Sequence, residues 1–276
     1  MHLRKRGRAI KLVVSDIDGT LLPPRGAVSP RNRRAVAALE DRGIPLALAS
    51  GRWFPSTASV AREVGATGPL IAANGGCVIT VDGEILKEFF MADADVQTAY
   101  DMLKDTGALI TSYVRGAIYR LNASSMENRP PEADAYFGGD LYTVIDDDTE
   151  RFEREACTGV YKMEAYSNDA ALLSALGDRL MRAGLSVTSS LPTNIEITSG
   201  ELGKGAALQW LAAHLDIDCS QVMAFGDNTN DLAMLARAGY GVAMGNSAPE
   251  LKRVARIIAP DCVDDGFARV IEERVL

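Results

Sequence analysis

Histidine is scarce in this sequence, which contains only His2 and His214. Two histidines leave little basis for a catalytic triad or a metal cluster built on histidine. The cysteines form no CxxC pair, which argues against a zinc site or a disulfide framework; they are Cys77, Cys157, Cys219 and Cys262. Such scattered cysteines fit a reducing cytoplasm. No run approaches the roughly 18 apolar residues of a membrane span, so we expect a cytoplasmic protein without a membrane partner.

Positive charge is in deficit, with a net charge of −8. A surplus of negative charge disfavours binding to a polyanion, so nucleic acid is not an expected partner. The one basic patch lies at the N-terminus and comprises Arg4, Lys5, Arg6, Arg8 and Lys11. The apolar stretch behind it is too short for a targeting segment and is broken by Lys11. We interpret the patch as a solvated tail leading into the first strand.

The sequence is otherwise of average globular composition, with 47% hydrophobic and 24% charged residues over 276 positions. Short apolar runs alternate with helical segments, which predicts a parallel sheet flanked by helices. The first half of this pattern has strands at 11–15, 44–50 and 69–76, and helices from about Pro30 to Gly43 and over 55–64. Ser29 and Pro30 form a favourable helix start. The second half has helices at 204–214, 229–237 and 248–255, and strands at 221–226, 240–244 and 256–259.

The segment between these halves has a different pattern. Asp82-Gly83 predicts a two-residue hairpin turn. The segment then continues with a helix over 93–104 and strands at 108–114 and 117–122. In the less regular stretch that follows, the pattern is broken at 129–134 and 137–140, and acidic residues 146–148 begin a helix. A strand (159–167), a helix (168–182) and two strands (185–190 and 193–198) follow. Because a helix followed by two strands occurs at both ends, we expect an inserted α/β domain with an antiparallel sheet.

The predicted fold is therefore α/β, with a doubly wound, Rossmann-like parallel-sheet core and an inserted cap. The core would comprise residues 1–82 and 199–276, and the cap residues 83–198. This division follows the change of pattern along the chain.

Polar residues interrupt the predicted core strands at their carboxyl ends, where open parallel sheets bind ligands. They are Asp16 and Asp18 in "DIDGTLL"; Ser50, Gly51 and Arg52 in "LALASGR"; Asn74 in "AANGG"; and Asp227, Asn230 and Asp231 in "GDNTND". Four carboxylates in one crevice repel each other unless a cation intervenes. Oxygen ligands suit Mg²⁺, and Lys204 adds a fixed positive charge.

This set of groups suits phosphoryl transfer. Asp16 could attack phosphorus while Asp18 protonates the leaving alcohol and then activates water. Ser50 and the backbone N–H groups after it could hold phosphate oxygens. Each residue also has a structural interpretation, since Asp before Gly is common in turns and caps. "LGKGAAL" is not a nucleotide-binding P-loop, because the GxxxxGK[ST] spacing is absent.

The motifs "DIDGTLL", "LALASGR", "LGKGAAL" and "GDNTND" resemble, in order and spacing, the four motifs of the haloacid dehalogenase-like hydrolases. The long insertion after the second motif and "AANGG" resemble the Cof-type (type IIB) members, which have the larger α/β cap. The resemblance implies that Asp16 is the nucleophile, Asp18 the general acid/base, and Ser50 and Lys204 phosphate ligands. It implies Mg²⁺ ligation by Asp16, the backbone carbonyl of Asp18, and Asp227, with Asp231 ligating directly or through water. Asn230, Arg52 and Asn74 match positions near the phosphate or the substrate pocket.

We therefore expect a Mg²⁺-dependent phosphatase, a phosphoric monoester hydrolase, acting through an aspartyl-phosphate. Its partner would be a small phosphorylated metabolite such as a sugar phosphate or a phosphorylated cofactor, and the protein would be a monomer or homodimer. A phosphotransferase or mutase of the same fold, and a non-catalytic sugar-phosphate sensor, stay open as alternatives. Cap residues for which a surface or packing role competes with ligand contact are Tyr113, Arg115, Tyr119, Asn122 and Lys162. Trp53 and Phe54 could stack on an aromatic ligand or fill the hinge.

Overall fold

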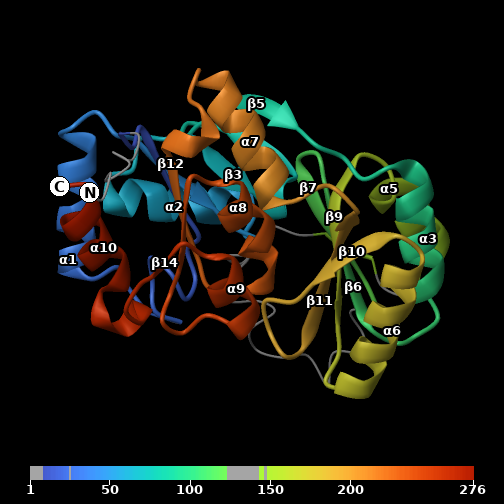
Figure 1. Ribbon diagram of the computed structural model, residues 1–276. Helices are drawn as coiled ribbons and strands as arrows, with labels where there is room; N and C mark the ends of the chain where they lie inside the picture. Colours follow the sequence, from blue (N-terminus) through green and yellow to red (C-terminus); the bar gives the residue numbers. More distant parts are fainter. Residues whose placement is uncertain (1–8, 25, 123–142, 146–147) are drawn as a thin grey trace.

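The computed structural model describes residues 9–24, 26–122, 143–145 and 148–276. Most of the basic N-terminal patch and the pattern breakers at 129–134 and 137–140 lie outside the described residues. The described chain forms two sheets that lie side by side, each with its own helices (Figure 1). Within these ranges no helix combines the length and the apolar character needed to cross a membrane.

The larger sheet has eight strands in the order β14-β13-β12-β1-β2-β3-β4-β5. Six pair in parallel: β14 (Ile257–Ile258), β13 (Tyr240–Ala243), β12 (Val222–Gly226), β1 (Leu12–Ser15), β2 (Leu46–Ala49) and β3 (Leu70–Ala72). Two antiparallel strands, β4 (Cys77–Ile79) and β5 (Ile85–Glu88), extend it. The α/β prediction with a parallel core is confirmed.

Helices cover both faces of this sheet, which explains why its central strands are continuous apolar runs. On one face, α1 (Pro30–Glu40), α2 (Phe54–Val64) and α10 (Gly266–Arg274) pack on side chains such as Val13 and Phe225. On the other, α7 (Lys204–His214), α8 (Leu232–Arg237) and α9 (Pro249–Val254) pack on Val14 and Ala224. The side chain of Ser29 caps α1 as expected, accepting the N–H of Asn32 at 3.0 Å. The doubly wound arrangement is therefore present.

The β4–β5 connection is longer than the predicted two-residue turn. The N–H of Thr80 donates to the carbonyl of Glu84, and Gly83 takes a positive φ of 99° within the loop. Because β5 pairs with β4 in the larger sheet, residues 85–88 extend the core sheet beyond the expected boundary at 82.

The smaller sheet has the order β10-β11-β9-β6-β7-β8. Its strands are β6 (Leu109–Val114), β7 (Ala117–Leu121), β8 (Thr143–Ile145), β9 (Val160–Tyr166), β10 (Leu185–Thr188) and β11 (Asn194–Ser199). They pair antiparallel except β7 with β8. Helices α3 (Asp93–Leu103), α5 (Thr149–Ala156) and α6 (Ala170–Arg182) cover the sheet face away from the core (Figure 1). We call this unit the cap.

Several element limits differ from the prediction. The predicted helix at 229–237 is a 3₁₀ turn, η4 (Thr229–Asp231), followed by α8. A helix start was predicted at acidic residues 146–148, and Asp148 is the N-cap of α5. Asp146 and Asp147 lie outside the described residues. β8 and α10 have no counterpart in the predicted element order.

Candidate active site

The sheet order brings three of the sequence motifs to one edge. β1 lies between β12 and β2, and the chain leaves each strand with polar residues. The N–H of Asp16 donates to the carbonyl of Phe225 at 3.0 Å, which continues the β1–β12 pairing up to the first carboxylate. The N–H of Ser50 donates to the carbonyl of Ile71 at 2.8 Å in the same way at the end of β2. The carboxyl ends of these strands therefore form one site.

Lys204 joins this site from the first position of α7. Its Nζ lies 2.5 Å from Oδ1 of Asp16 and 2.8 Å from Oδ1 of Asp231. The lysine is 1% exposed and Asp231 is fully buried. Burial lowers the pKa of Lys204, but the charges of Asp16 and Asp231 outweigh it and raise that pKa above its ordinary value. The ammonium is therefore a permanent positive charge in the site.

The surroundings of Asp16 disfavour the ionised form of its carboxyl group. Burial raises its pKa well above the ordinary value; Lys204 opposes that rise, and the neighbouring acids Asp231, Asp227 and Asp18 add to it. Burial likewise raises the pKa of Asp227 to about 7, and Asp231 adds to this rise while the Thr20 hydroxyl counteracts it. The site thus disfavours the ionised forms of two carboxylates, and a cation that entered it would stabilise them.

Three carboxylates are placed to hold such a cation. Oxygens of Asp16, Asp227 and Asp231 lie within 4.8 Å of one another. Both oxygens of Asp231 already have partners, because Oδ1 accepts from Lys204 and Oδ2 accepts the N–H groups of Asp227 and Asn228 at 3.1 Å. An all-oxygen, anionic donor set fits Mg²⁺.

Gly19 allows Asp227 to approach the first motif. A Cβ at Gly19 would lie 2.4 Å from Oδ2 of Asp227, and its φ of +80° disfavours any other residue. Next to it, the Thr20 hydroxyl donates to Oδ1 of Asp227 at 2.7 Å. The Gly-Thr pair of "DIDGTLL" therefore positions a carboxylate that follows it by more than two hundred residues.

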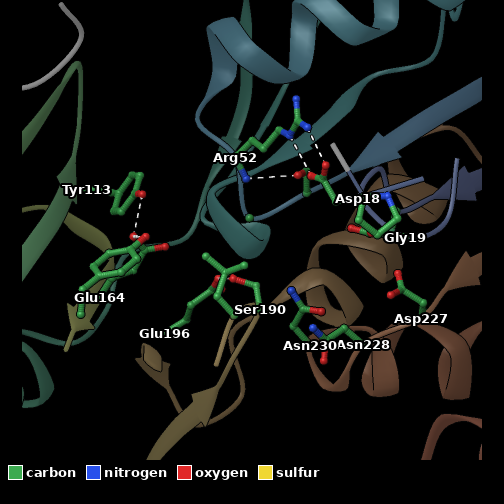
Figure 2. Close-up of a pocket in the computed structure, with 16 residues that line it drawn as sticks. Asp18, Gly19, Arg52, Tyr113, Glu164, Ser190, Glu196, Asp227, Asn228 and Asn230 are labelled. Carbon is green, nitrogen blue, oxygen red and sulfur yellow. Dashed lines mark hydrogen bonds and ion pairs between the residues drawn. The ribbon is translucent and has the colours of Figure 1, made fainter. Parts of the chain in front are cut away.

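Asp18 is bound by Arg52. The guanidinium donates two hydrogen bonds, from Nε to Oδ2 at 2.8 Å and from Nη2 to Oδ1 at 2.6 Å. The N–H of Arg52 donates to Oγ of Ser50 at 3.1 Å. Figure 2 shows this pair on the core side of the pocket. Arg52, predicted to line the substrate pocket, lines a pocket together with Asp18, whose carboxyl it contacts.

Asn74 and Asn230 connect the core to the cap. Asn74 sits in the turn η1 (Ala73–Gly75) with a left-handed φ of 57°. Nδ2 of Asn230 donates to Oδ1 of Asn74 at 3.0 Å, and Nδ2 of Asn74 donates to Oε2 of Glu196 on β11. Asn230 lines the pocket, whereas Asn74 lies behind it and is 4% exposed.

One pocket lies between the core and the cap. Asp16, Asp18, Ser50, Gly51, Arg52, Asp227 and Asn230 line it from the core, with Gly19, Pro24 and Asn228. The cap contributes Tyr113, Glu164, Tyr166, Ser190, Leu191 and Glu196. Lys204, Asp231 and Asn74 contact these residues from behind.

Of the five cap residues named from the sequence, only Tyr113 lines the pocket. Lys162 binds Glu164 behind the wall at 2.5 Å, and Arg115 pairs with Glu88 at the surface. Tyr119 packs on the helix side of the cap sheet, and Nδ2 of Asn122 donates to the carbonyl of Ala108. Trp53 and Phe54 pack beside Tyr113 and Tyr161 between the core and the cap. This packing agrees with the hinge-filling role rather than with stacking on a ligand.

The sequence analysis missed the acids of the cap wall, Glu164 and Glu196. A signal was present, because each stands at the centre of an apolar strand, in "VYKMEAY" and "NIEITS". Charged residues at alternate positions of a buried strand indicate a polar face turned towards a ligand.

The family model of haloacid dehalogenase-like hydrolases matches residues 13–271. The 5-amino-6-(5-phospho-D-ribitylamino)uracil phosphatase of Bacillus subtilis is 28% identical over 100% of both chains. The HMP-PP phosphatase of Cronobacter sakazakii is 30% identical over 87% of this chain and 86% of its own.

Among solved structures, a haloacid dehalogenase-like hydrolase from B. subtilis superposes with a TM-score of 0.83 at 25% identity, covering 96% of this chain and 100% of the other. A sugar phosphatase of subclass IIB superposes with a TM-score of 0.80 at 18% identity, over 95% of this chain and 98% of its own, which supports the fold of core and cap together.

Proposed function

The chain belongs to the haloacid dehalogenase-like hydrolases and is a phosphoric monoester hydrolase, and on that basis we propose that it is a Mg²⁺-dependent phosphatase of a small phosphorylated metabolite, acting through an aspartyl-phosphate. The observation that carries this proposal is the set formed by Asp16, Lys204 and the acids around them. Asp16 lines the pocket, so its carboxylate is available to an incoming phosphate ester.

In the first half of the reaction, an oxygen of Asp16 attacks phosphorus, and the bond from phosphorus to the alcohol oxygen breaks. Asp18 gives its proton to the departing alkoxide. Ser50 and the backbone that follows it would donate to the phosphoryl oxygens, and the positive charge of Lys204 favours the ionised form of Asp16.

In the second half, water attacks the phosphorus of the aspartyl-phosphate, and Asp18 accepts the proton that the water loses. The bond from Asp16 to phosphorus breaks, which restores the carboxylate and releases phosphate. Arg52 orients the carboxyl of Asp18 in its ionised form, which is the form that accepts the proton from water.

The proposed metal ligands are Asp16, Asp227 and the backbone carbonyl of Asp18, with Asp231 ligating directly or through water. When bound, Mg²⁺ would offset the negative charge that gathers on the phosphoryl oxygens. The carboxylate cluster and the raised pKa of Asp227, about 7, support a cation at this place.

Both relatives named above are phosphatases, although their names give different substrates. These relatives support hydrolysis over the phosphotransferase and sensor alternatives. Because their substrates differ, we infer the substrate class from the side chains of the cap.

Asp16→Asn tests the mechanism. We expect phosphate release from a panel of phosphate esters with Mg²⁺ to fall by at least about a thousandfold, because the amide is a poor nucleophile. Asp178→Asn, an exposed change on α6, is the matched control. Circular dichroism would show that both variants are folded. Normal turnover by folded Asp16→Asn would contradict the mechanism.

A further inference from the structure

The face of the cap sheet that is turned towards the core is a buried polar surface. Cross-strand pairing places Arg120, Thr111, Glu164 and Glu196 in one row across β7, β6, β9 and β11. All four are at most 3% exposed. Alternate residues such as Met163, Ala165 and Ile197 face the helices in the apolar core of the cap. Burying such a polar row is unfavourable unless its groups are paired or serve a ligand.

The hydrogen bonds of Glu164 fix the polarity of the pocket wall. Its Oε2 accepts the hydroxyl of Tyr113 at 2.8 Å and that of Tyr166 at 2.7 Å. Its Oε1 accepts Nζ of Lys162 at 2.5 Å. Burial and the charge of Glu164 raise the pKa of both tyrosines well above the ordinary value, so the hydroxyls keep their protons. Because those protons point at Glu164, the phenol oxygens can only accept hydrogen bonds from a ligand.

Glu196 extends this acceptor surface towards the core. Its Oε1 accepts the Ser190 hydroxyl at 2.6 Å, and its Oε2 accepts Nδ2 of Asn74. Each carboxylate oxygen keeps a further lone pair. A Cβ at Gly51 would lie 3.5 Å from both oxygens, so Glu196 stands directly above the loop of Ser50 and Arg52. Figure 2 shows Tyr113, Glu164 and Glu196 across the pocket from Arg52 and Asp18.

The cations of this region are set back from the pocket. Lys162 is 1% exposed and Arg120 fully buried, and neither lines the pocket. Within the described residues that line it, Arg52 is the one cation, and two of its five N–H groups already donate to Asp18, which offsets its positive charge.

We propose, resting on the phosphatase function above, that Tyr113, Tyr166 and Glu196 form a leaving-group subsite that selects an uncharged alcohol rich in O–H or N–H donors. An apolar leaving group offers no donor to the acceptor wall and displaces water from it, which costs binding in the transition state relative to a donor-rich leaving group. A leaving group with a second anion meets lone pairs and carboxylates, so it is rejected.

Three phosphate esters with the same five-carbon chain test the subsite. D-ribitol 5-phosphate carries hydroxyl donors, pentyl phosphate carries none, and 5-phospho-D-ribonate replaces the far hydroxymethyl group of the first by a carboxylate. With Mg²⁺, we expect kcat/KM to be at least about tenfold higher for the ribitol ester than for the pentyl ester, since one buried hydrogen bond is worth about that factor. We expect the ribonate ester to be at least about tenfold poorer than the ribitol ester.

Tyr166→Phe removes one acceptor and keeps the ring. We expect it to lower the ratio of kcat/KM for ribitol over pentyl phosphate by about tenfold. Tyr119→Phe is the matched control, because this tyrosine lies in the same sheet but packs on the helix side, so the ratio should not change.

Glu196→Gln tests the charge of the wall. It replaces a carboxylate by an amide of similar shape that also offers a donor, so discrimination against the ribonate ester should weaken by about tenfold. If Tyr166→Phe fails to fold, this variant and the three-ester comparison on the wild type still decide the question.

The results separate the two proposals. Phosphate release that is lost in Asp16→Asn but equal for the three esters, or greatest for the ribonate ester, overturns the subsite and leaves the phosphatase intact. A folded wild type that releases no phosphate from these esters or from phenyl phosphate overturns the phosphatase proposal and the subsite with it.

Discussion

Gly19 shows how one small residue controls the geometry of the site. Gly19→Ala would place a Cβ 2.4 Å from the carboxylate of Asp227, in addition to the strain of a φ of +80°. We expect a loss of roughly 3 kcal/mol in the free energy of unfolding and of most activity, because Asp227 must shift. Urea unfolding and phosphate release would measure both.

Gly43→Ala is the matched control for that change. Its φ of +69° is similar, but no atom lies within 4 Å of the added Cβ. Gly43→Ala should lower the free energy of unfolding by about 1 kcal/mol, because it adds only backbone strain, and should leave activity unchanged. Equal losses in the two variants would show that the contact with Asp227 is unimportant.

Among the individual site residues, the sequence identified those whose chemistry is unusual for their place in a strand. Asp16, Ser50 and Asp227 could be found because each follows an apolar strand. Glu164 and Glu196 were missed because their importance depends on which face of the cap sheet is turned to the core, and the sequence does not record how two sheets face each other.

Between elements, Glu88 joins the last strand of the core sheet to the cap. At the end of β5 it accepts Nε of Arg115 at 2.9 Å, from the β6–β7 turn, and the hydroxyl of Tyr161 on β9. Burial raises the pKa of Glu88, but these hydrogen bonds outweigh it and lower that pKa below the ordinary value of 4.5. The stabilisation is therefore present above the unfolded-state pKa and is lost as the pH falls through the lower folded-state pKa.

Glu88→Gln should accordingly lower the thermal unfolding midpoint at neutral pH. The difference from the wild type should shrink as the pH falls below about 4, because the wild-type carboxylate is then protonated too. Glu84→Gln, an exposed change in the adjacent loop, should have little effect at any pH. Identical midpoints of Glu88→Gln and the wild type at neutral pH would show that the contact does not stabilise the protein.

The elements themselves were predicted best where periodicity was long. The helices α1, α3, α6 and α7 were predicted within a few residues, because caps such as Ser29 and several turns of apolar spacing mark them. The helix expected at 229–237 was only partly right, since the side chain of Asp231 turns back to accept the N–H groups of Asp227 and Asn228, and the first turn is 3₁₀. The β4–β5 loop also differed, because tertiary pairing with β3 set the length of β4.

For the molecule as a whole, the carboxylate cluster ties stability to the metal. Mg²⁺ that binds only the folded state should raise the free energy of unfolding by about 2.7 kcal/mol at a concentration 100 times its dissociation constant. Asp227→Asn should remove most of this effect, and Asp178→Asn should keep it. Thermal unfolding with Mg²⁺ and with excess chelator measures the difference. Equal midpoints in the two conditions for the wild type would contradict a Mg²⁺ site.

The sequence by itself indicated the chemistry of the core and the order of most of its elements, with α10 as an exception. Apolar strands followed by acids are local patterns, and the rule that parallel strands present their carboxyl ends at one edge carries Asp16, Asp18, Ser50 and Asp227 to a common site. The motif resemblance then indicated the same residues and the presence of a cap.

Only the tertiary structure decided what meets across the pocket. The bidentate contact of Arg52 with Asp18, the chain from Asn230 through Asn74 to Glu196, and the acceptor wall of Tyr113 and Tyr166 each join residues from different elements or domains. Such contacts are set by packing between elements far apart in the chain, and the one between Asn74 and Glu196 also depends on how the cap sheet is turned towards the core. Periodicity along the sequence carries no record of either.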